Sequence, residues 1–425
     1  MTEFPTDRFW FFEWLDDHRV NSIEDFQRIA TRRRVLDDLH HRALAALEGQ
    51  ETIGAGIQID PRYDIVAGAD MDLSGEESCA YVGCRLRQVE ELFRRAWFYF
   101  DRIVIADSVS PHLASPDTDE LWLRDLFDHV TVLLRVREIG AEDLVAFHRK
   151  DLSFCQDCTP RALREAGISE QRVDEYITNY ARGARAVTES VSGDGRIVLL
   201  THPKYRGLCE VGVPNTGKGS LKAKASNIAL RGTLQSLLVD SSIARALATP
   251  LGTTDAIYHD FMTMASPDVA QVAFNLNLPV LDNVPIDTLI KIRTDETHHF
   301  ERFRDSLRRA VREQLAVKPE RRTDEIALEI TSDIIEPELR QIGRRLKAAD
   351  DTLARKTGVA VGVGALITTC GLVTGLIPAI ILGSSVIAGG IVVPRQQYYD
   401  RIEDIQLSDM FFLWKALEHR IHPED

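Results

Sequence analysis

The sequence predicts a mostly α-helical protein with an α/β (or α+β) soluble portion and a C-terminal hydrophobic helical hairpin. Three observations lead to this fold class. Apolar residues recur at helical spacing over most of the 425 residues. Short apolar runs of the strand type interrupt this pattern at a few places. Residues 357–394 contain no Asp, Glu, Lys, Arg or His.

The overall composition, 44% hydrophobic and 27% charged, is that of a folded protein. A net charge of −14 argues against generic nucleic-acid binding, which needs a dominant basic surface. The N-terminal stretch is aromatic but lacks a basic region followed by an apolar run, so a signal peptide is not expected. The six cysteines are too sparse for a disulfide scaffold, and we therefore expect a location in the cytoplasm.

The first domain is expected to cover residues 1–150 and to combine helices with short buried strands. Residues 8–48 and 76–100 have helical spacing. The runs "DRIVIADS" (101–108) and "HVTVLLRVRE" (129–138) are predicted to be strands. A cluster of aromatic residues near the N-terminus is expected to pack in the core or against another helix: Trp10, Phe11, Phe12 and Trp14.

The second domain, expected over residues 151–320, contains a near match to a phosphate-binding P-loop. Strands are predicted at 193–203 and 207–213, and a helix is predicted from 221 onward with Ser220 as its N-cap. "GVPNTGKGS" between them has the Gly, four residues, Gly and Lys of a P-loop, but Gly219 replaces the hydroxyl that binds Mg²⁺. No Walker-B strand follows the loop, because the best such run ends at Asp107 and precedes it.

Two interpretations of this loop stay open. In the first it is a surface loop without a ligand. In the second it binds a phosphate-like anion with backbone N–H groups and nearby lysines, since a strand precedes it and a helix follows. The candidate anion-binding residues are Gly212, Gly217, Lys218, Ser220, Lys222 and Lys224.

A metal site around Cys155-x-x-Cys158 is the second candidate. A structural zinc ion needs about four Cys or His ligands. The further ligands that the sequence offers are His202 and Cys209, although the chain lacks the second CxxC of a zinc ribbon. Ordinary thiols, or a redox pair at the start of a helix, are the open alternatives.

Glu296 and His299 have the i, i+3 spacing of one half of a carboxylate-bridged di-metal site. The second Glu-x-x-His and the two further glutamates of such a site do not appear in the sequence. We therefore expect this stretch to be a charged and solvated helix face. No catalytic residues are predicted anywhere, and no cofactor is identified.

A charged helical connector (321–356) is followed by the charge-free segment Thr357–Pro394. As one helix the segment would be about 57 Å long, nearly twice a hydrocarbon core of roughly 30 Å, so two spans broken near Gly375 fit better. Basic residues flank it on both sides, which favours a hairpin whose ends stay on the cytoplasmic face. The open alternative is a hairpin buried in the core of a soluble protein.

The last 31 residues (395–425) form an amphipathic tail, expected to dock on the soluble part or to lie at a membrane interface. The first predicted function is a membrane-associated, non-enzymatic effector or sensor that controls Thr357–Pro394 at the inner face of the cytoplasmic membrane. It permeabilises the bilayer in the manner of toxin-like or defence proteins. The second is a soluble anion- or nucleotide-binding protein or enzyme. The partners expected are membrane lipid, a protein trigger or anionic ligand, and a second copy of the chain.

Overall fold

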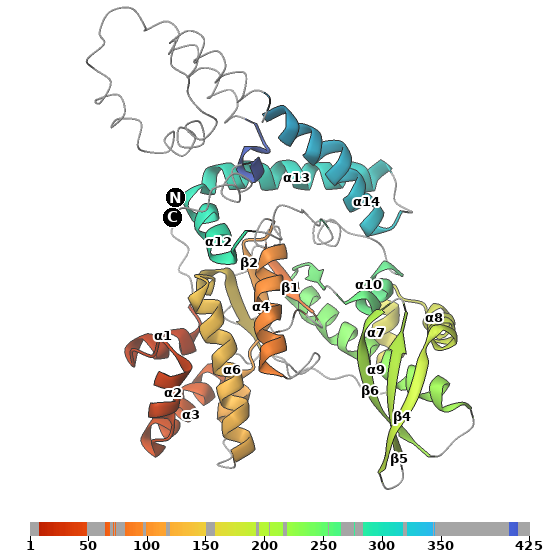
Figure 1. The fold of residues 1–425 in the computed structure, drawn as a ribbon, viewed down its shortest axis with the longest axis horizontal. Coiled ribbons are helices and arrows are strands. Elements are labelled where there is room, and N and C mark those ends of the chain that lie inside the picture. The colour runs from red at the N-terminus through yellow and green to blue at the C-terminus, as the bar shows by residue number, and fades with distance from the viewer. Residues whose placement is uncertain are drawn as a thin grey trace, which may run out of the picture. The chain divides into compact units, whose positions relative to one another are not determined.

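The computed structural model describes residues 8–48, 64–68, 71, 73, 81–96, 99–115, 120–149, 158–192, 195–203, 205–215, 219–253, 255–264, 276, 284–317, 321–342, 344 and 408–414. The chain divides into two compact units, Met1–Asn275 (the first unit) and Leu276–Asp425 (the second unit). The fold is mostly helical, with one small parallel and one small antiparallel sheet, as the sequence predicts (Figure 1). The segment Thr357–Pro394 lies outside the described residues.

Helices make up most of the first unit. Their placement follows the apolar spacing of the sequence: three helices lie within 8–48, as expected, and the helix expected over 76–100 is confirmed for Val82–Ala96. The described helices of this unit are α1 (Trp10–Asp17), α2 (Ile23–Ala30), α3 (Arg33–Glu48), α4 (Val82–Ala96), α5 (Val109–Ala114), α6 (Glu120–Glu138), the 3₁₀ turn η2 (Glu142–Leu144), α7 (Thr159–Glu165), α8 (Glu170–Gly183), α9 (Leu221–Ala246) and α10 (Ala256–Thr263).

The parallel sheet has the strand order β3-β2-β1-β7. Its members are β1 (Asp64–Ala67), β2 (Arg102–Ala106), β3 (Val145–His148) and β7 (Leu251–Gly252). β1 is buried along its whole length and β2 over its last four residues, as expected for strands covered on both faces. β2 is the strand that the sequence predicts in "DRIVIADS".

The antiparallel sheet is a three-stranded meander of β4 (Arg185–Ser192), β5 (Gly195–His202) and β6 (Tyr205–Pro214). β5 and β6 confirm the strands predicted at 193–203 and 207–213. Along β5 buried and more exposed residues alternate, as in a sheet with one face on the core and one face open. Figure 1 shows these strands as a long ribbon with α9 beside them.

Helix α9 joins the two sheets into one core. Ser220 is its N-cap, as predicted, because the Ser220 hydroxyl accepts a hydrogen bond from the Ala223 N–H at 3.2 Å. The leucines of α9 pack in the same buried cluster as side chains from both sheets. That cluster includes Val66, Val104, Val198, Leu200, Val211, Val213, Leu230, Leu234, Leu237 and Leu238.

The strand expected at residues 129–138 is wrong, because these residues belong to α6. Val130, Val132, Leu134 and Val136 alternate with other residues and so imitate the period of a strand. Leu133 is buried as well, and α6 packs against α2, α4 and α5. A helix that is covered on several sides has apolar residues at nearly successive positions, and its helical period is then hidden.

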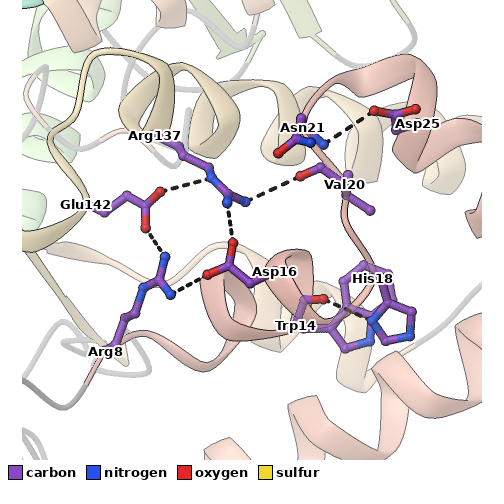
Figure 2. A network of polar contacts seen from close by, with 9 residues as sticks. All are labelled: Arg8, Trp14, Asp16, His18, Val20, Asn21, Asp25, Arg137 and Glu142. Carbon is purple, nitrogen blue, oxygen red and sulfur yellow. Dashed lines mark hydrogen bonds and ion pairs between the residues drawn. The ribbon is translucent and has the colours of Figure 1, made fainter.

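The aromatic N-terminal cluster packs in the core, as expected, with Phe11, Phe12 and Trp14 fully buried. A ring of charged groups next to this cluster ties α1 to the C-terminal end of α6 (Figure 2). The Arg8 and Arg137 guanidiniums each contact both carboxylates of the ring, Asp16 and Glu142. Hydrogen bonding to Glu142 raises the pKa of Arg8 above its ordinary value, so the arginine stays charged.

The second unit is helical in its described residues. It contains α12 (Ile286–Asp295), α13 (Thr297–Val317) and α14 (Thr323–Ile330), followed by the π-helical turn η4 (Thr331–Ile335). The expected domain boundary near 150 falls between β3 and α7 inside the first unit, and the one near 320 falls between α13 and α14 inside the second. Among the helices that the structure describes, none is both long and apolar enough to cross a membrane.

Candidate functional site

The carboxyl edge of the parallel sheet is the place where the first unit gathers buried polar groups. β1, β2 and β3 follow one another in a single direction across the sheet, and β7 then adds on the other side of β1. In open α/β sheets such a reversal leaves a crevice at the carboxyl ends of the strands, and ligands bind there. The residues directly after β1 and β2 at this edge are Gly68 and Asp107.

Asp107 is buried, with 4% of its surface exposed. Its Oδ1 atom accepts hydrogen bonds from the backbone N–H groups of Val109 and Ser110 at 3.0 and 2.9 Å, which start helix α5. Its Oδ2 atom has no hydrogen-bond partner in the part of the chain that the structure describes. One half of this carboxylate is therefore used by the fold, and the other half is not.

Burial raises the pKa of Asp107 above its ordinary value of 3.8, and the hydrogen bonds from Ser110 and Val109 oppose the rise. Ionisation therefore costs the folded state free energy. The stabilising contribution of the neutral form is complete below the ordinary pKa and is lost as the pH rises through the raised pKa. A hydrogen-bond donor or a cation placed at Oδ2 would offset this cost.

Gly68 marks the carboxyl end of β1, where the backbone leaves no room for a side chain. A Cβ atom there would lie 2.9 Å from Cδ1 of Leu251, 3.1 Å from Oδ2 of Asp240 and 3.2 Å from Cε1 of Tyr258. The Tyr258 hydroxyl donates to Asp240 Oδ2 at 2.5 Å, and both side chains are buried. The edge thus brings a second buried carboxylate against the end of β1.

At the opposite edge of the sheet the buried acid, Asp64, forms an ion pair. Asp64 begins β1 and is 1% exposed, and Arg102 at the start of β2 donates to its Oδ2 at 2.8 Å. This ion pair supplies the positive charge that a buried carboxylate requires. Asp107, at the other end of β2, receives no such cation from the described residues.

A buried cationic group also holds the segment that follows β1. Arg85, at the start of α4, donates to the Leu73 carbonyl at 2.7 Å and to Nδ1 of His129 at 2.9 Å. Burial, followed by the charges of Arg85 and His112, lowers the pKa of His129 to about 3. His129 is therefore neutral at pH 7 and serves as an acceptor for Arg85.

The near-P-loop residues lie between the antiparallel strand β6 and helix α9, and not at the edge of the parallel sheet. Gly212 lies in the antiparallel strand β6, and a Cβ atom on it would meet nothing within 4 Å, so no close approach requires glycine there. Ser220 uses its hydroxyl to cap α9, whose first turn carries Lys222 and Lys224. Gly217 and Lys218 lie outside the described residues.

The candidate zinc ligands are only partly described. Cys158 is exposed at the N-cap of α7, and the His202 ring stacks on Tyr180 with a centroid separation of 4.4 Å. Cys209 lies in β6 opposite Leu200, and Cys155 lies outside the described residues. The residues that the structure describes contain no group of three or more His, Cys, Asp or Glu side chains arranged for a metal ion.

No family model, no curated protein and no solved structure matches the chain. The fold and the candidate sites are therefore inferred from the chain's own sequence and structure.

The second unit fixes the amphipathic tail on α13, as expected for a docked segment. Phe412 is fully buried, with ring centroids 5.3 Å from Phe300 and 5.9 Å from Phe303. Asp409 accepts hydrogen bonds from Arg302 and Arg309 at 3.2 Å each. The described part of the tail, residues 408–414, is therefore held by both apolar and charged contacts to one helix.

The solvated helix face expected around Glu296 is wrong for that residue, because Glu296 is 7% exposed. It stands at the junction of α12 and α13, where Arg293 and Arg304 are buried too and lie against the Phe300 ring. His299 Nε2 is 3.9 Å from the Glu296 carboxylate. Glu296, Arg293 and Arg304 are interior to the second unit because two helices meet there, whereas Asp295 and Glu301 are exposed as expected.

The sequence gives an unequal signal for these groups. Asp107 is visible as an acid directly after a buried apolar run, which is where the carboxyl end of a parallel strand exposes functional side chains. Asp240 gives no signal, because it lies in the middle of a helical pattern. Its approach to Gly68 depends on the way α9 packs on β1.

Proposed function

We propose that the protein is a membrane-associated, non-enzymatic effector or sensor that places Thr357–Pro394 as a hairpin in the inner face of the cytoplasmic membrane. The first unit perceives a ligand or partner, and the second unit carries the hairpin. Release of the segment into the bilayer is the output, with permeabilisation as its toxin-like or defence-like consequence.

One observation carries this proposal: the described residues before and after the charge-free segment pack on the same helix, α13. α14 packs against α13 before the charge-free segment, and Phe412 packs against α13 after it. A membrane hairpin needs the chain on its two sides to be held by the same body, and α13 holds both. This supports a hairpin with both ends on one side of a membrane rather than a single crossing.

The sequence of the segment adds a second line of support. Its 38 residues carry no charge, and Lys356 and Arg395 flank it directly. Cytoplasmic loops prefer such basic flanks. Gly358 and Gly362, like Gly371 and Gly375, have the spacing that lets two helices approach closely in lipid.

The alternative is a soluble protein in which Thr357–Pro394 is a buried core hairpin. The two functions differ in one measurement, the flotation of the full chain with vesicles of phosphatidylethanolamine and phosphatidylglycerol. Val363→Arg and Val386→Arg each place a charge near the middle of one predicted span. A charge at the bilayer centre costs about 2.5–3.5 kcal/mol on insertion scales. Leu328→Arg is the matched control, because Leu328 on α14 is 71% exposed.

We expect the full chain and Leu328→Arg to float with the vesicles, and Val363→Arg, Val386→Arg and a chain lacking 357–394 to remain unbound. Cooperative thermal unfolding of the deletion variant checks that the rest of the chain is folded. A full chain that never floats, together with a deletion variant that no longer unfolds cooperatively, establishes the core hairpin instead. Equal flotation of all variants also overturns the proposal.

A further inference from the structure

Three basic side chains meet between helices α4, α5 and α6 of the first unit. His129 is on α6, which packs against α4 and α5, and Figure 1 shows α4 beside it. The ring of His112 on α5 meets the His129 ring edge to face, with centroids 5.4 Å apart. Arg85 on α4 is 3% exposed and donates to His129 Nδ1 at 2.9 Å. We call Arg85, His112 and His129 the basic cluster.

The hydrogen bond between Arg85 and His129 requires a neutral imidazole. A guanidinium has no acceptor, so Nδ1 of His129 accepts and cannot carry a proton. Arg85 is held in place, because its Nε and Nη2 atoms also donate to the Leu73 carbonyl at 3.1 and 2.7 Å. A proton on Nδ1 would therefore set two donors against each other and place a second positive charge beside a buried guanidinium.

The helices packed around His129 bring positive charge toward its ring. Burial is the largest cause of its lowered pKa, and Arg85 from α4 and His112 from α5 lower the pKa further. The third helix packed on α6 is α2, which contributes a ring contact instead, between Phe26 and Phe127 with centroids 6.1 Å apart. Protonation of His129 within the closed packing is therefore opposed from both α4 and α5.

The acids of α4 and α6 that lie nearest in the fold do not offset such a proton. Glu90 on α4 faces α6, but it accepts a hydrogen bond from Arg135, further along that helix, at 2.5 Å. On α6 itself Asp125 is exposed and Asp128 is partly exposed. Neither forms an ion pair with His129 in the part of the chain that the structure describes. A charge on His129 would thus stay uncompensated by these three carboxylates.

The consequence appears when α6 separates from α4 and α5. An exposed histidine takes up a proton with the ordinary pKa of 6.5, whereas the closed packing lowers the pKa of His129 to about 3. The closed packing therefore has its full stability above the ordinary value of 6.5, and it loses stability as the pH falls from 6.5 toward 3. Within this window each pH unit favours opening by about tenfold.

We propose that the basic cluster is an acid-sensitive latch, which holds α6 on α4 and α5 at neutral pH and opens the first unit in mild acid. His129 takes up the proton, and Arg85 and His112 make the closed form reject it. Histidines at packed interfaces act as pH sensors in this way. The latch rests on the proposed function in one respect, since it makes acid the signal that the first unit perceives. Its opening occurs in solution and is measured without a membrane.

The test is hydrogen exchange of the full chain, followed by mass spectrometry at about pH 7.5 and about pH 5. Exchange rates of the α4, α5 and α6 amides, corrected for the intrinsic pH dependence of exchange, give the opening equilibrium constant. His129→Asn keeps an acceptor near the position of Nδ1 but cannot take up a proton. His41→Asn, at an exposed histidine on α3, is the matched control.

We expect the opening constant to rise about 30-fold between the two pH values in wild type and His41→Asn, and less than about 3-fold in His129→Asn. An equal rise in wild type and His129→Asn overturns the proposal, and so does a wild-type constant that does not change with pH. Where the full chain floats with vesicles, acid should raise the floating fraction of wild type but not of His129→Asn. Floating fractions that are equal at both pH values refute acid as the signal.

A second measurement uses the wild-type chain alone. NMR of the ring protons follows all 12 histidines during an acid titration of the chain. At least one ring, that of His129, should keep its neutral chemical shift down to about pH 5. Titration of every ring above this pH overturns the proposal, even where His129→Asn folds poorly. A chain that fails to float leaves these results unchanged, so failure of the latch and failure of the proposed function are distinguishable.

Discussion

Strands β2 and β6 each lead into a helix whose first turn is capped by a side-chain oxygen. At the β2–α5 junction this oxygen belongs to Asp107, which precedes the N-cap residue Ser108 and is buried at the edge of a parallel sheet. At the β6–α9 junction the cap is Ser220, which is exposed at the end of an antiparallel meander. The sequence at the β6–α9 junction partly matches a phosphate-binding motif, whereas the sequence at the β2–α5 junction matches no such motif.

The difference lies in what each cap leaves unused. The Ser220 hydroxyl is engaged by α9, and the nearby Gly212 has open space around it. Asp107 keeps one carboxylate oxygen without a partner among the described residues, and Gly68 on the neighbouring strand has no space at all. A motif is informative only in its structural context, and a buried parallel edge is a better context for a ligand than an exposed antiparallel one.

The two sheets should differ most in how much stability a truncated side chain costs, because their side chains differ in burial. Ile65 on β1 is fully buried, whereas Val187 on β4 is 64% exposed. Ile65→Ala should lower the free energy of unfolding by about 2–5 kcal/mol, because it removes buried methyl groups and leaves a cavity. Val187→Ala should cost less than about 1 kcal/mol. Urea denaturation measures both, and equal losses would contradict the contrast.

The glycines give the next contrast. Gly68→Ala places a Cβ atom 2.9 Å from Leu251 and should cost about 1–3 kcal/mol through overpacking. Gly212→Ala meets nothing within 4 Å and should leave the stability unchanged or slightly raised. Thermal unfolding of the two variants side by side is sufficient. A Gly212→Ala variant as unstable as Gly68→Ala would show that the β6–α9 junction is also closely packed.

The cap of α9 should have a smaller effect. Ser220→Ala is expected to lower the free energy of unfolding by about 1 kcal/mol, since the Ala223 N–H loses its acceptor. Ser220→Asp keeps an acceptor and should retain most of the stability. If inorganic phosphate stabilises the wild-type chain but not Ser220→Ala, the hydroxyl serves a ligand as well as the helix, and the two junctions are more alike than we infer.

Substitutions in the charged ring around Asp16 should change the free energy of unfolding least. They provide a reference value for partly exposed charges. Burial would raise the pKa of Asp16, but the hydrogen bonds and charges of Arg8 and Arg137 outweigh burial and lower it. The stabilisation is therefore complete above the ordinary value of 3.8 and is lost as the pH falls through the lowered pKa. Asp16→Asn should cost less than about 1 kcal/mol at pH 7, because Asp16 is partly exposed.

Urea denaturation of Asp16→Asn at several pH values measures this baseline. The difference from wild type should shrink on acidification. The buried Asp107 behaves in the opposite way, because its raised pKa makes the wild-type chain lose stability relative to Asp107→Asn as the pH rises from 3.8. The same sign of pH dependence for both acids would contradict the contrast between exposed and buried carboxylates.

Much of the fold is predictable from local pattern. The strands at β2, β5 and β6, the Ser220 cap and the buried N-terminal aromatics follow from apolar spacing and turn chemistry. The pattern wrongly predicts a strand at α6, because several neighbouring helices bury this helix at once. It wrongly predicts an exposed Glu296, because two helices meet there. The local sequence of a helix does not determine how many other elements pack against it. Both wrong predictions have this cause.

The sites are less predictable than the elements. Asp107 carries a readable signal, an acid after a buried strand, but its unused oxygen depends on the hydrogen bonds that α5 makes. The closeness of Asp240 to Gly68 depends on long-range packing of α9, which no local pattern records. The candidate residues Gly217, Lys218 and Cys155 lie outside the described residues, so the loop and the metal site stay predictions.

The docking of Phe412 on α13, which α14 also contacts, means that the proposed hairpin closes a loop between two contacts to one helix. The entropy of closing a loop grows only slowly with its length, so removing residues 357–394 changes it by less than about 1 kcal/mol. A protease that cuts the backbone between residues 344 and 408 should likewise leave two fragments that remain associated. Under the proposed function, Thr357–Pro394 could thus be exchanged, tagged or clipped while the contacts of α14 and Phe412 with α13 are kept.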